Sequence, residues 1–196
     1  MLKISDYKNY DYKEDYWIKE SRSYENKCEQ QTVNRLIQCC KNRDSIVDIG
    51  CGFGRLFNTY QPYTKKQILL DYADHLLDQA KKELQNIKNT TFIKGNMYEM
   101  PLDSESCDIA LSIRTLHHIE KPTLFFKEIY RILKPSGHAI IEIPNKRNIL
   151  TISRYIIGKS KFNPFTKAPY HHGETFINFH PKDIKEKLKQ AGFKII

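Results

Sequence analysis

Short apolar runs alternate with amphipathic stretches along most of the chain. Runs of about four to eight apolar residues are typical of buried strands, whereas apolar residues at every third or fourth position predict helices. The predicted strands cover residues 46–49, 67–71, 90–94, 108–112 and 138–143, and the predicted helices cover 25–41, 74–84, 122–133 and 181–190. This alternation predicts a single α/β domain with an open, mostly parallel sheet and right-handed crossovers.

The first predicted strand leads directly into a glycine-rich turn. Residues 46–55 read I-V-D-I-G-C-G-F-G-R, with a glycine at every second position after the strand. Glycine adopts positive φ and has no Cβ, so a ligand can come close to such a backbone. The spacing differs from the dinucleotide-binding pattern G-x-G-x-x-G, which disfavours a nicotinamide-linked oxidoreductase. A tight turn without any ligand remains an alternative on this motif alone.

Four further elements follow the glycine turn in a fixed order. They are the acid Asp71 at the end of the second strand, the turn G-N-M at 95–97, the stretch L-H-H-I at 116–119, and E-I-Y-R-I-L-K-P-S-G at 128–137 before an apolar strand. Together with D-x-G-x-G-x-G, this set resembles the class I S-adenosylmethionine (SAM) methyltransferases, and specifically the methyltransferase type 11 group. That group usually shows K-P-G-G where this chain has K-P-S-G. The resemblance implies a Rossmann-like fold, SAM as the cofactor, and methyl transfer as the activity.

The resemblance also implies cofactor contacts at the carboxyl ends of the strands, where open parallel sheets bind ligands. The glycine loop would hold the carboxylate of SAM, and Asp71 would accept hydrogen bonds from the ribose hydroxyls, although a helix cap is the alternative for Asp71. Asn96 stands where many relatives have Asp and would accept a hydrogen bond from adenine. Met97 would lie on the adenine face or only fill the core. The full predicted cofactor set is Asp48, Gly50, Cys51, Gly52, Gly54, Asp71, Tyr72, Asn96, Met97 and Ser112.

His117 and His118 follow the fourth predicted strand and are the candidate catalytic residues, because imidazole titrates near neutrality. A base is needed only if the acceptor carries a proton, so a helix cap and a packed core histidine are alternatives. Arg114, Tyr170 and His171 are candidates for contacting the substrate, with a surface ion pair as the alternative for Arg114. The motifs N-P-P-Y, D-P-P-Y and Pro-Cys are absent from the end of the fourth strand, which disfavours a nucleic-acid substrate and favours a small molecule. No Cys/His cluster has zinc spacing, so no metal is expected.

The excess positive charge is concentrated in one segment. The net charge is +9, and no acidic residue occurs between Ile143 and Gly173. Six cations lie there: Lys146, Arg147, Arg154, Lys159, Lys161 and Lys167. We interpret residues 144–180 as a basic lid over the substrate. Peripheral contact with a membrane surface and binding of nucleic-acid phosphate are alternatives. The latter keeps an RNA- or protein-directed methyltransferase in view, beside a SAM-binding protein without catalysis.

The ends of the chain complete the predicted organisation. Residues 1–41 are expected to form an arm and a helix packed on a SAM-binding domain at 42–196. Residues 193–196 (F-K-I-I) are expected to begin a sixth strand, and the seventh strand of the family would then be missing. The start of the chain has no signal-peptide core, no apolar run approaches a membrane span, and the five cysteines show no C-x-x-C spacing. These features favour a cytoplasmic protein with reduced thiols, and none indicates an oligomeric state.

Overall fold

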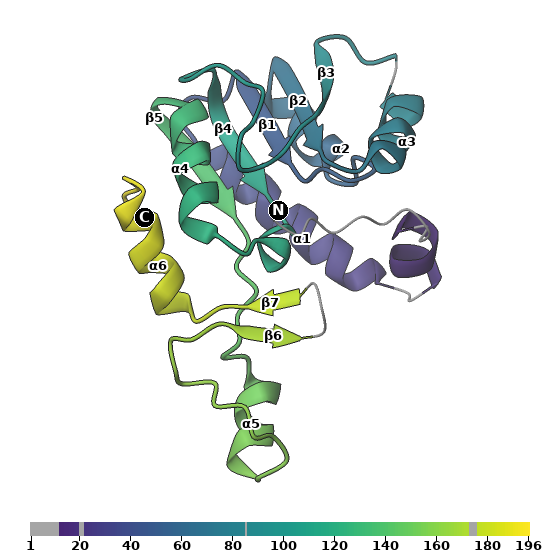
Figure 1. Ribbon diagram of the computed structural model, residues 1–196. Helices are drawn as coiled ribbons and strands as arrows, with labels where there is room; N and C mark the ends of the chain where they lie inside the picture. Colours follow the sequence, from purple (N-terminus) through teal and green to yellow (C-terminus); the bar gives the residue numbers. More distant parts are fainter. Residues whose placement is uncertain (1–11, 20–21, 85, 173–175) are drawn as a thin grey trace. The chain divides into compact units, whose positions relative to one another are not determined.

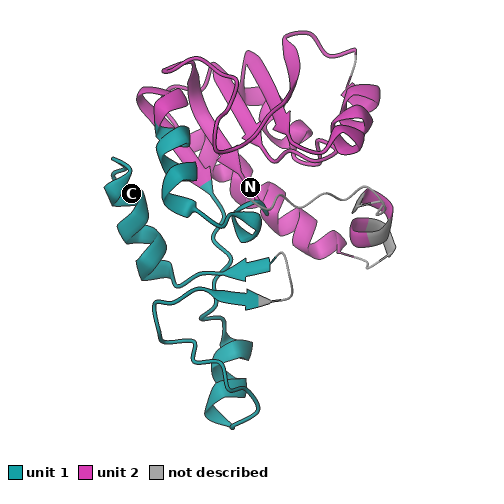
Figure 2. Ribbon diagram, viewed as in Figure 1, with its two compact units in different colours: residues 1–5, 114–130, 141–196 teal, residues 6–113, 131–140 magenta. Residues whose placement is uncertain are grey.

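The computed structural model describes residues 12–19, 22–84, 86–172 and 176–196 (Figure 1). The chain divides into two compact units, each described here by itself (Figure 2). Unit 2 comprises residues 6–113 and 131–140, and unit 1 comprises residues 1–5, 114–130 and 141–196.

Unit 2 is built on a five-stranded sheet with the order β3-β2-β1-β4-β5. The strands are β1 (Ser45–Ile49), β2 (Lys66–Asp71), β3 (Thr90–Lys94), β4 (Cys107–Ser112) and β5 (Leu133–Ile141). β1 pairs in parallel with β2 and β4, so that Val47 lies opposite Ile68 on one side and Ala110 on the other. Every residue of β1 and β4 is buried, which explains why most residues of both strands are apolar. The predicted Rossmann-like α/β architecture is therefore confirmed.

In the described part of unit 2, five helices accompany the sheet. They are η1 (Tyr12–Lys19), α1 (Ser23–Cys39), α2 (Phe57–Tyr60), η2 (Gln61–Tyr63) and α3 (Asp74–Leu84). Of these, α1, α2 and α3 bury apolar residues in a common core with the sheet. In α1, Val33 and Ile37 are spaced by one turn and both are buried. The core cluster joins them to Phe57 and Tyr60 of α2 and to Leu77 of α3. This core supports the strand ends that lead into the glycine turn.

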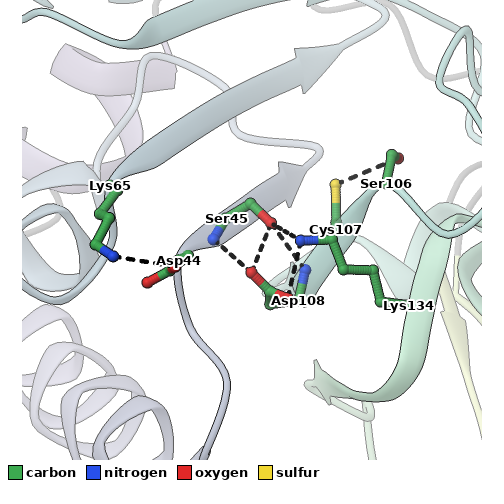
Figure 3. A network of polar contacts seen from close by, with 7 residues as sticks. All are labelled: Asp44, Ser45, Lys65, Ser106, Cys107, Asp108 and Lys134. Carbon is green, nitrogen blue, oxygen red and sulfur yellow. Dashed lines mark hydrogen bonds and ion pairs between the residues drawn. The ribbon is translucent and has the colours of Figure 1, made fainter.

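A polar network closes the amino-terminal end of β1 and β4 (Figure 3). The hydroxyl and the backbone N–H of Ser45 donate to Asp108 Oδ2, each at 2.8 Å, and Lys134 Nζ donates to Asp108 Oδ1 at 3.0 Å. Burial raises the pKa of the Asp108 carboxyl, but the hydrogen bonds from Lys134 and Ser45 outweigh this and hold the pKa below its ordinary value. The network therefore ties three strands together with a fully paired buried carboxylate.

Unit 1 contains short helices and a hairpin. Its elements are η3 (Leu116–His118), most of α4 (Pro122–Ile132), α5 (Ile149–Ile156), β6 (Tyr170–His172), β7 (Phe176–Asn178) and α6 (Pro181–Gln190). β6 and β7 pair antiparallel. Directly after β7, Phe179 forms a parallel bridge with Asn145: its N–H donates to Pro144 O at 2.8 Å, and its carbonyl accepts from Lys146 N at 3.1 Å. Among the described residues, none of the helices has the length and apolar character needed to cross a membrane.

Three features of the structure differ from the prediction. The strand expected at residues 193–196 is wrong, because these residues follow α6 without regular structure. The ring of Phe193 instead packs edge-on against Tyr130 of α4, with ring centroids 5.3 Å apart. The fifth strand begins at Leu133 instead of residue 138, and the K-P-S-G sequence forms a kink inside it, with Ser136 at φ 65°. The hairpin β6–β7 was not predicted, since strands of three residues give too short an alternation to recognise.

Candidate functional site

The glycine loop joins β1 to α2 in a left-handed backbone conformation. Gly50, Gly52 and Gly54 have φ angles of 72°, 55° and 79°. The N–H groups of Gly50 and Cys51 both donate to Leu70 O, at 2.8 and 3.2 Å, and so fix the start of the loop to β2. Three residues with positive φ in alternate positions require glycine, since other residues pay a steric penalty there.

Two of these glycines have different surroundings. A Cβ on Gly54 would lie 3.1 Å from Leu84 Cδ1 and 3.4 Å from Leu69 Cδ2, so the loop packs closely on α3 and β2 at this point. A Cβ on Gly52 would meet no described atom within 4 Å. Gly54 therefore serves the packing of the loop, whereas Gly52 borders open space that a ligand can enter.

Asp71 links the end of β2 to the loop. Its Oδ2 accepts a hydrogen bond from Gly52 N at 2.7 Å, and its Oδ1 accepts one from Ala73 N at 2.9 Å. Burial raises the pKa of this carboxyl, and the backbone hydrogen bonds offset part of the rise. Each carboxylate oxygen can accept a second hydrogen bond, so this arrangement leaves acceptor capacity beside the open space at Gly52.

Asp48 is the most deeply buried acid of the site, with 3% of its surface exposed at the end of β1. Its Oδ2 accepts a hydrogen bond from Tyr60 OH at 3.2 Å. Burial raises its pKa to about 7, although the Tyr60 hydrogen bond and the positive charge of Arg55 act in the opposite direction. The same burial raises the pKa of the Cys51 thiol well above its ordinary value. Asp48 thus changes its charge near neutrality, while Cys51 stays a neutral thiol.

The remaining predicted cofactor residues lie at or just beyond the ends of β2, β3 and β4. Tyr72 is exposed, and Met97 is half-buried within a turn. Asn96 Oδ1 already accepts a hydrogen bond from Tyr98 N at 3.0 Å within the turn. This bond uses one of the two lone pairs of the oxygen. Ser112 is fully buried, and its hydroxyl has no hydrogen-bond partner among the described residues. Burying a hydroxyl without a hydrogen-bond partner costs free energy. Ser112 is therefore a position where a bound ligand could supply the missing hydrogen bond.

In unit 1, the two predicted catalytic histidines pack against one aromatic ring. His117 stacks on Phe176 of β7, with centroids 5.0 Å apart and an interplanar angle of 10°. His118 lies 5.2 Å from the same ring and 4.0 Å from His117. Burial, together with the charges of His118 and Arg114, lowers the pKa of His117 to about 3. His117 is therefore neutral in the physiological range, and it is a weak base.

The three candidate substrate residues of unit 1 have different settings. Arg114 has a left-handed backbone, with φ 56°, and its N–H donates to Glu142 Oε2 at 2.7 Å. The ring of Tyr170 packs against Phe162 with centroids 3.8 Å apart and an interplanar angle of 30°, and His171 is exposed on β6. A left-handed non-glycine residue costs free energy, so the position of Arg114 is imposed by its surroundings. Within the described part of the chain, no group of three or more His, Cys, Asp or Glu side chains is placed to hold a metal ion.

Comparison with known proteins now places the geometry of unit 2 in a family. Residues 47–141 match the family described as "Methyltransferase domain". This stretch, just under half of the chain, is similar to a methyltransferase domain of the class I type. The match begins in β1, includes the glycine loop and Asp71, and ends with β5, so it contains the whole predicted cofactor set. S-adenosylmethionine is the cofactor that this family implies.

Individual relatives agree with the family match at low sequence identity. The chain is similar to a probable S-adenosylmethionine-dependent methyltransferase from Mycolicibacterium smegmatis, with 23% identity over 93% of this chain. It spans 61% of that protein's length. A demethylmenaquinone methyltransferase from Chlamydia caviae is 28% identical over 78% of this chain and 71% of its own length. A solved SAM-dependent methyltransferase from Mesorhizobium loti shares the fold, with a TM-score of 0.66, 20% identity, and coverage of 85% of this chain and 82% of the other.

The residues of the methyltransferase domain fit SAM. The open space beside Gly52 and the unpaired hydroxyl of Ser112 are both features that the described protein atoms leave unused. Asp71 retains acceptor capacity for hydroxyl groups. A nucleoside with an amino-acid tail requires this combination: room against a glycine backbone, a carboxylate acceptor and polar groups at the strand ends.

Sequence reasoning missed one part of the methyltransferase domain, the contacts of Arg55 with the N-terminal helices. Arg55 directly follows the glycine loop, and its guanidinium donates to Glu29 Oε2 at 2.6 Å and Asn26 Oδ1 at 2.7 Å, both on α1. The same guanidinium lies over the ring of Trp17, 4.0 Å from its centroid. An arginine after the third glycine and the aromatic N-terminal segment were both visible in the sequence, but no local pattern connects them.

Proposed function

We propose that this protein transfers the methyl group of SAM to a small-molecule acceptor. The observation that carries the proposal is the link between Asp71 and Gly52 N at 2.7 Å, beside open space at the carboxyl ends of the strands of a methyltransferase domain. A demethylmenaquinone methyltransferase among the relatives acts, by its name, on a small molecule, which supports the proposed class of acceptor.

On the cofactor side, each strand end has a proposed task. The glycine loop would receive the amino-acid half of SAM, and Asp71 would accept hydrogen bonds from the ribose hydroxyls. Asn96 and Met97 would contact the adenine, with the second lone pair of Asn96 Oδ1 available as an acceptor. Ser112 would gain the hydrogen bond that it lacks. SAM supplies a methyl group that is already activated, so these residues need only bind and orient it and exclude water.

On the acceptor side, we assign His117 a role in positioning the acceptor and not in removing its proton. A group with a pKa of about 3 has too low an affinity for a proton to act as an efficient base at neutral pH. Its flat stack on Phe176 suits contact with an aromatic or otherwise apolar acceptor. Arg114, Tyr170 and His171 would contact other parts of the acceptor. Residues 144–180 would cover it, and His118 is the proposed base if the acceptor needs one.

Calorimetry tests the cofactor assignment first. We expect SAM and S-adenosylhomocysteine to bind the purified protein, whereas NAD should not bind. Binding of NAD without SAM would overturn the proposal. Release of S-adenosylhomocysteine across a library of small molecules would then identify the acceptor class. Turnover with RNA or protein but with no small molecule would redirect the acceptor assignment while leaving the cofactor assignment intact.

Two substitutions separate the positioning and base roles of His117. His117→Phe retains a flat ring on Phe176, and His117→Ala removes it. If His117 positions the acceptor, the Phe variant should keep most of the wild-type kcat/KM, and the Ala variant should lose roughly tenfold or more through KM. Equal loss in kcat for both variants, with a changed pH profile, would instead assign proton transfer to His117.

A further inference from the structure

Helix α5 presents an apolar face to solvent. Ile149, Leu150, Ile156 and Ile157 are 84%, 59%, 71% and 61% exposed. Seven residues make about two helical turns, so residues 149 and 156 lie above one another, and so do residues 150 and 157. The four side chains therefore lie along one side of the helix as an apolar stripe, in which the exposed Ser153 is a polar position between the two pairs. Such a stripe on the outside of a helix is the reverse of the usual pattern, in which the apolar face is buried.

The opposite side of α5 is already occupied by its own segment. Tyr155 packs edge-on against Phe165, with ring centroids 6.1 Å apart, and the guanidinium of Arg147 lies 5.4 Å from the centroid of the Phe165 ring. Asn148 caps the helix by accepting a hydrogen bond from Thr151 N at 2.9 Å. The helix is thus capped and supported from one side, which leaves its apolar stripe on the other side available.

Lys146 connects the residues before α5 to the end of the loop that follows this helix. It is 1% exposed, and its ammonium group donates to Ala168 O and, at 3.3 Å, to Thr166 Oγ1. It also lies 5.2 Å from the centroid of the Phe162 ring. These contacts tie the end of the loop after α5 to the residues that lead into the helix. At the start of the loop, Lys159 N donates to Arg154 O at 2.9 Å, which keeps Lys159 beside the last turn of α5.

The charges around the stripe all have one sign. Arg154, Lys159 and Lys161 are exposed and have no ion-pair partner among the described residues. The sequence contains no acidic residue between Ile143 and Gly173. Lys167 differs, because it pairs with Glu186 at 2.6 Å. Three unpaired cations next to an apolar stripe are suited to a surface that offers both hydrocarbon and negative charge.

We propose that this α5 surface, formed by Ile149, Leu150, Ile156 and Ile157 with Arg154, Lys159 and Lys161, docks the protein on an anionic lipid bilayer. The apolar stripe would enter the boundary between headgroups and acyl chains, while the three cations would meet lipid phosphates. Nucleic acid offers phosphates but leaves an aliphatic stripe without a partner. A second copy of the α5 surface would bring like charges together. An anionic bilayer offers hydrocarbon to the apolar stripe and phosphates to the cations. The docking does not depend on the identity of the methyl acceptor.

Vesicle sedimentation tests the proposal with the full chain. We expect binding to vesicles of equimolar phosphatidylcholine and phosphatidylglycerol, weaker binding in high salt, and little binding to phosphatidylcholine alone. The combined variant Ile149→Ser, Ile156→Ser and Ile157→Ser should reduce the partition coefficient by about tenfold or more. Its matched control is Tyr24→Ser with Leu124→Ser, which removes exposed apolar side chains from α1 and α4 and should bind like the wild type.

A charge series and a fluorescence probe complete the test. Arg154→Gln, Lys159→Gln and Lys161→Gln together should weaken binding by about tenfold to hundredfold at low salt. The equally charged change Lys185→Gln, Lys189→Gln and Lys194→Gln, at exposed positions elsewhere in unit 1, should weaken it far less. An Ile156→Trp side chain should show blue-shifted emission when anionic vesicles are added.

Several outcomes would overturn the proposal. One is the absence of vesicle binding at either composition, and another is binding that the α5 variants leave unchanged. A dimer in light scattering that the triple-Ser variant converts to a monomer, without vesicle binding, would show that a second copy covers the stripe. RNA binding that depends on the three cations but not on the three isoleucines would assign the surface to nucleic acid.

Discussion

The two ends of the strands in unit 2 hold buried aspartates in opposite ways. At the amino-terminal end, Asp108 is 6% exposed and paired with Lys134 and Ser45, and its pKa lies below the ordinary value. At the carboxyl end, Asp48 is 3% exposed, has the phenol of Tyr60 as its hydrogen-bond partner, and has a pKa of about 7. The two acids belong to neighbouring strands of one sheet. The surroundings of Asp108 stabilise its ionised form, whereas those of Asp48 stabilise its protonated form.

The difference shows how the domain divides stability and function between its two ends. A buried carboxylate with a lysine and two donors contributes to folding, since its charge is compensated. A buried carboxylate with one neutral donor opposes folding once it ionises. The destabilised acid lies next to the glycine loop that we assign to SAM, where incompletely compensated groups are typical of binding sites. Four substitutions test this comparison.

The largest effect is expected at the carboxyl end, where Gly52→Val should abolish SAM binding. The new side chain would fill the open space beside the loop. Gly158→Val is a matched control, because Gly158 also has positive φ (72°) and open space around its Cβ but lies in unit 1. Both variants should lose about 1–2 kcal/mol of stability from the left-handed backbone. Calorimetry should find that only Gly158→Val retains SAM affinity; equal affinity in a folded Gly52→Val protein would reject the site.

Asp48→Asn should stabilise the protein without cofactor. The pKa of Asp48 is raised in the folded state, so ionisation favours unfolding as the pH rises above 3.8 toward 7. Asn keeps an acceptor for Tyr60 and carries no charge. The free energy of unfolding should rise by about 3 kcal/mol at pH 8, and the gain should vanish near pH 4. Urea unfolding at both pH values, with exposed Asp103→Asn as a control, measures this; a gain independent of pH would contradict the burial of a charge.

Asp108→Asn should have the opposite effect and lower the free energy of unfolding by about 2–3 kcal/mol at pH 7, because Lys134 and Ser45 lose a charged partner. The pKa of Asp108 is lowered in the folded state, so its contribution is present above the ordinary pKa of 3.8 and disappears as the pH falls through the folded value. Asp44→Asn removes the exposed pair with Lys65 shown in the same figure and should cost less than about 1 kcal/mol (Figure 3). Similar losses in both variants would show that the buried network contributes no more to the free energy of unfolding than an exposed ion pair does.

Asp71→Ala should weaken SAM binding by about 2–3 kcal/mol, the scale for removing a charged acceptor from two hydroxyl groups. Asp74→Ala is the matched control, since Asp74 is the exposed first residue of α3 and pairs with Lys94 at 2.5 Å. Its removal should change SAM affinity much less. The reverse order of the two affinities would mean that the wrong acid had been assigned to the ribose.

The sequence predicted the parts of the molecule whose signals are local. The strand β1, the glycines after it and Asp71 at the end of β2 each follow from a few neighbouring residues, and the family match confirms the fold to which they belong. The pKa of Asp48 could not be predicted, because it depends on burial by chain segments far apart in sequence. The strand expected at residues 193–196 failed for a related reason: Phe193 finds its apolar partner in Tyr130, 63 positions earlier in the printed sequence.

The same dependence on distant partners gives the Asp108 network a place in the order of folding. Ser45 and Asp108 are 63 residues apart, and Lys134 is 89 residues from Ser45, so the contacts require three assembled strands. Closing such long loops is slow, and we expect this side-chain network to be completed only after the strands have paired, beyond the rate-limiting step. We therefore expect Asp108→Asn to accelerate unfolding in stopped-flow experiments while leaving the refolding rate nearly unchanged. The network would then slow unfolding and so lengthen the lifetime of the folded domain.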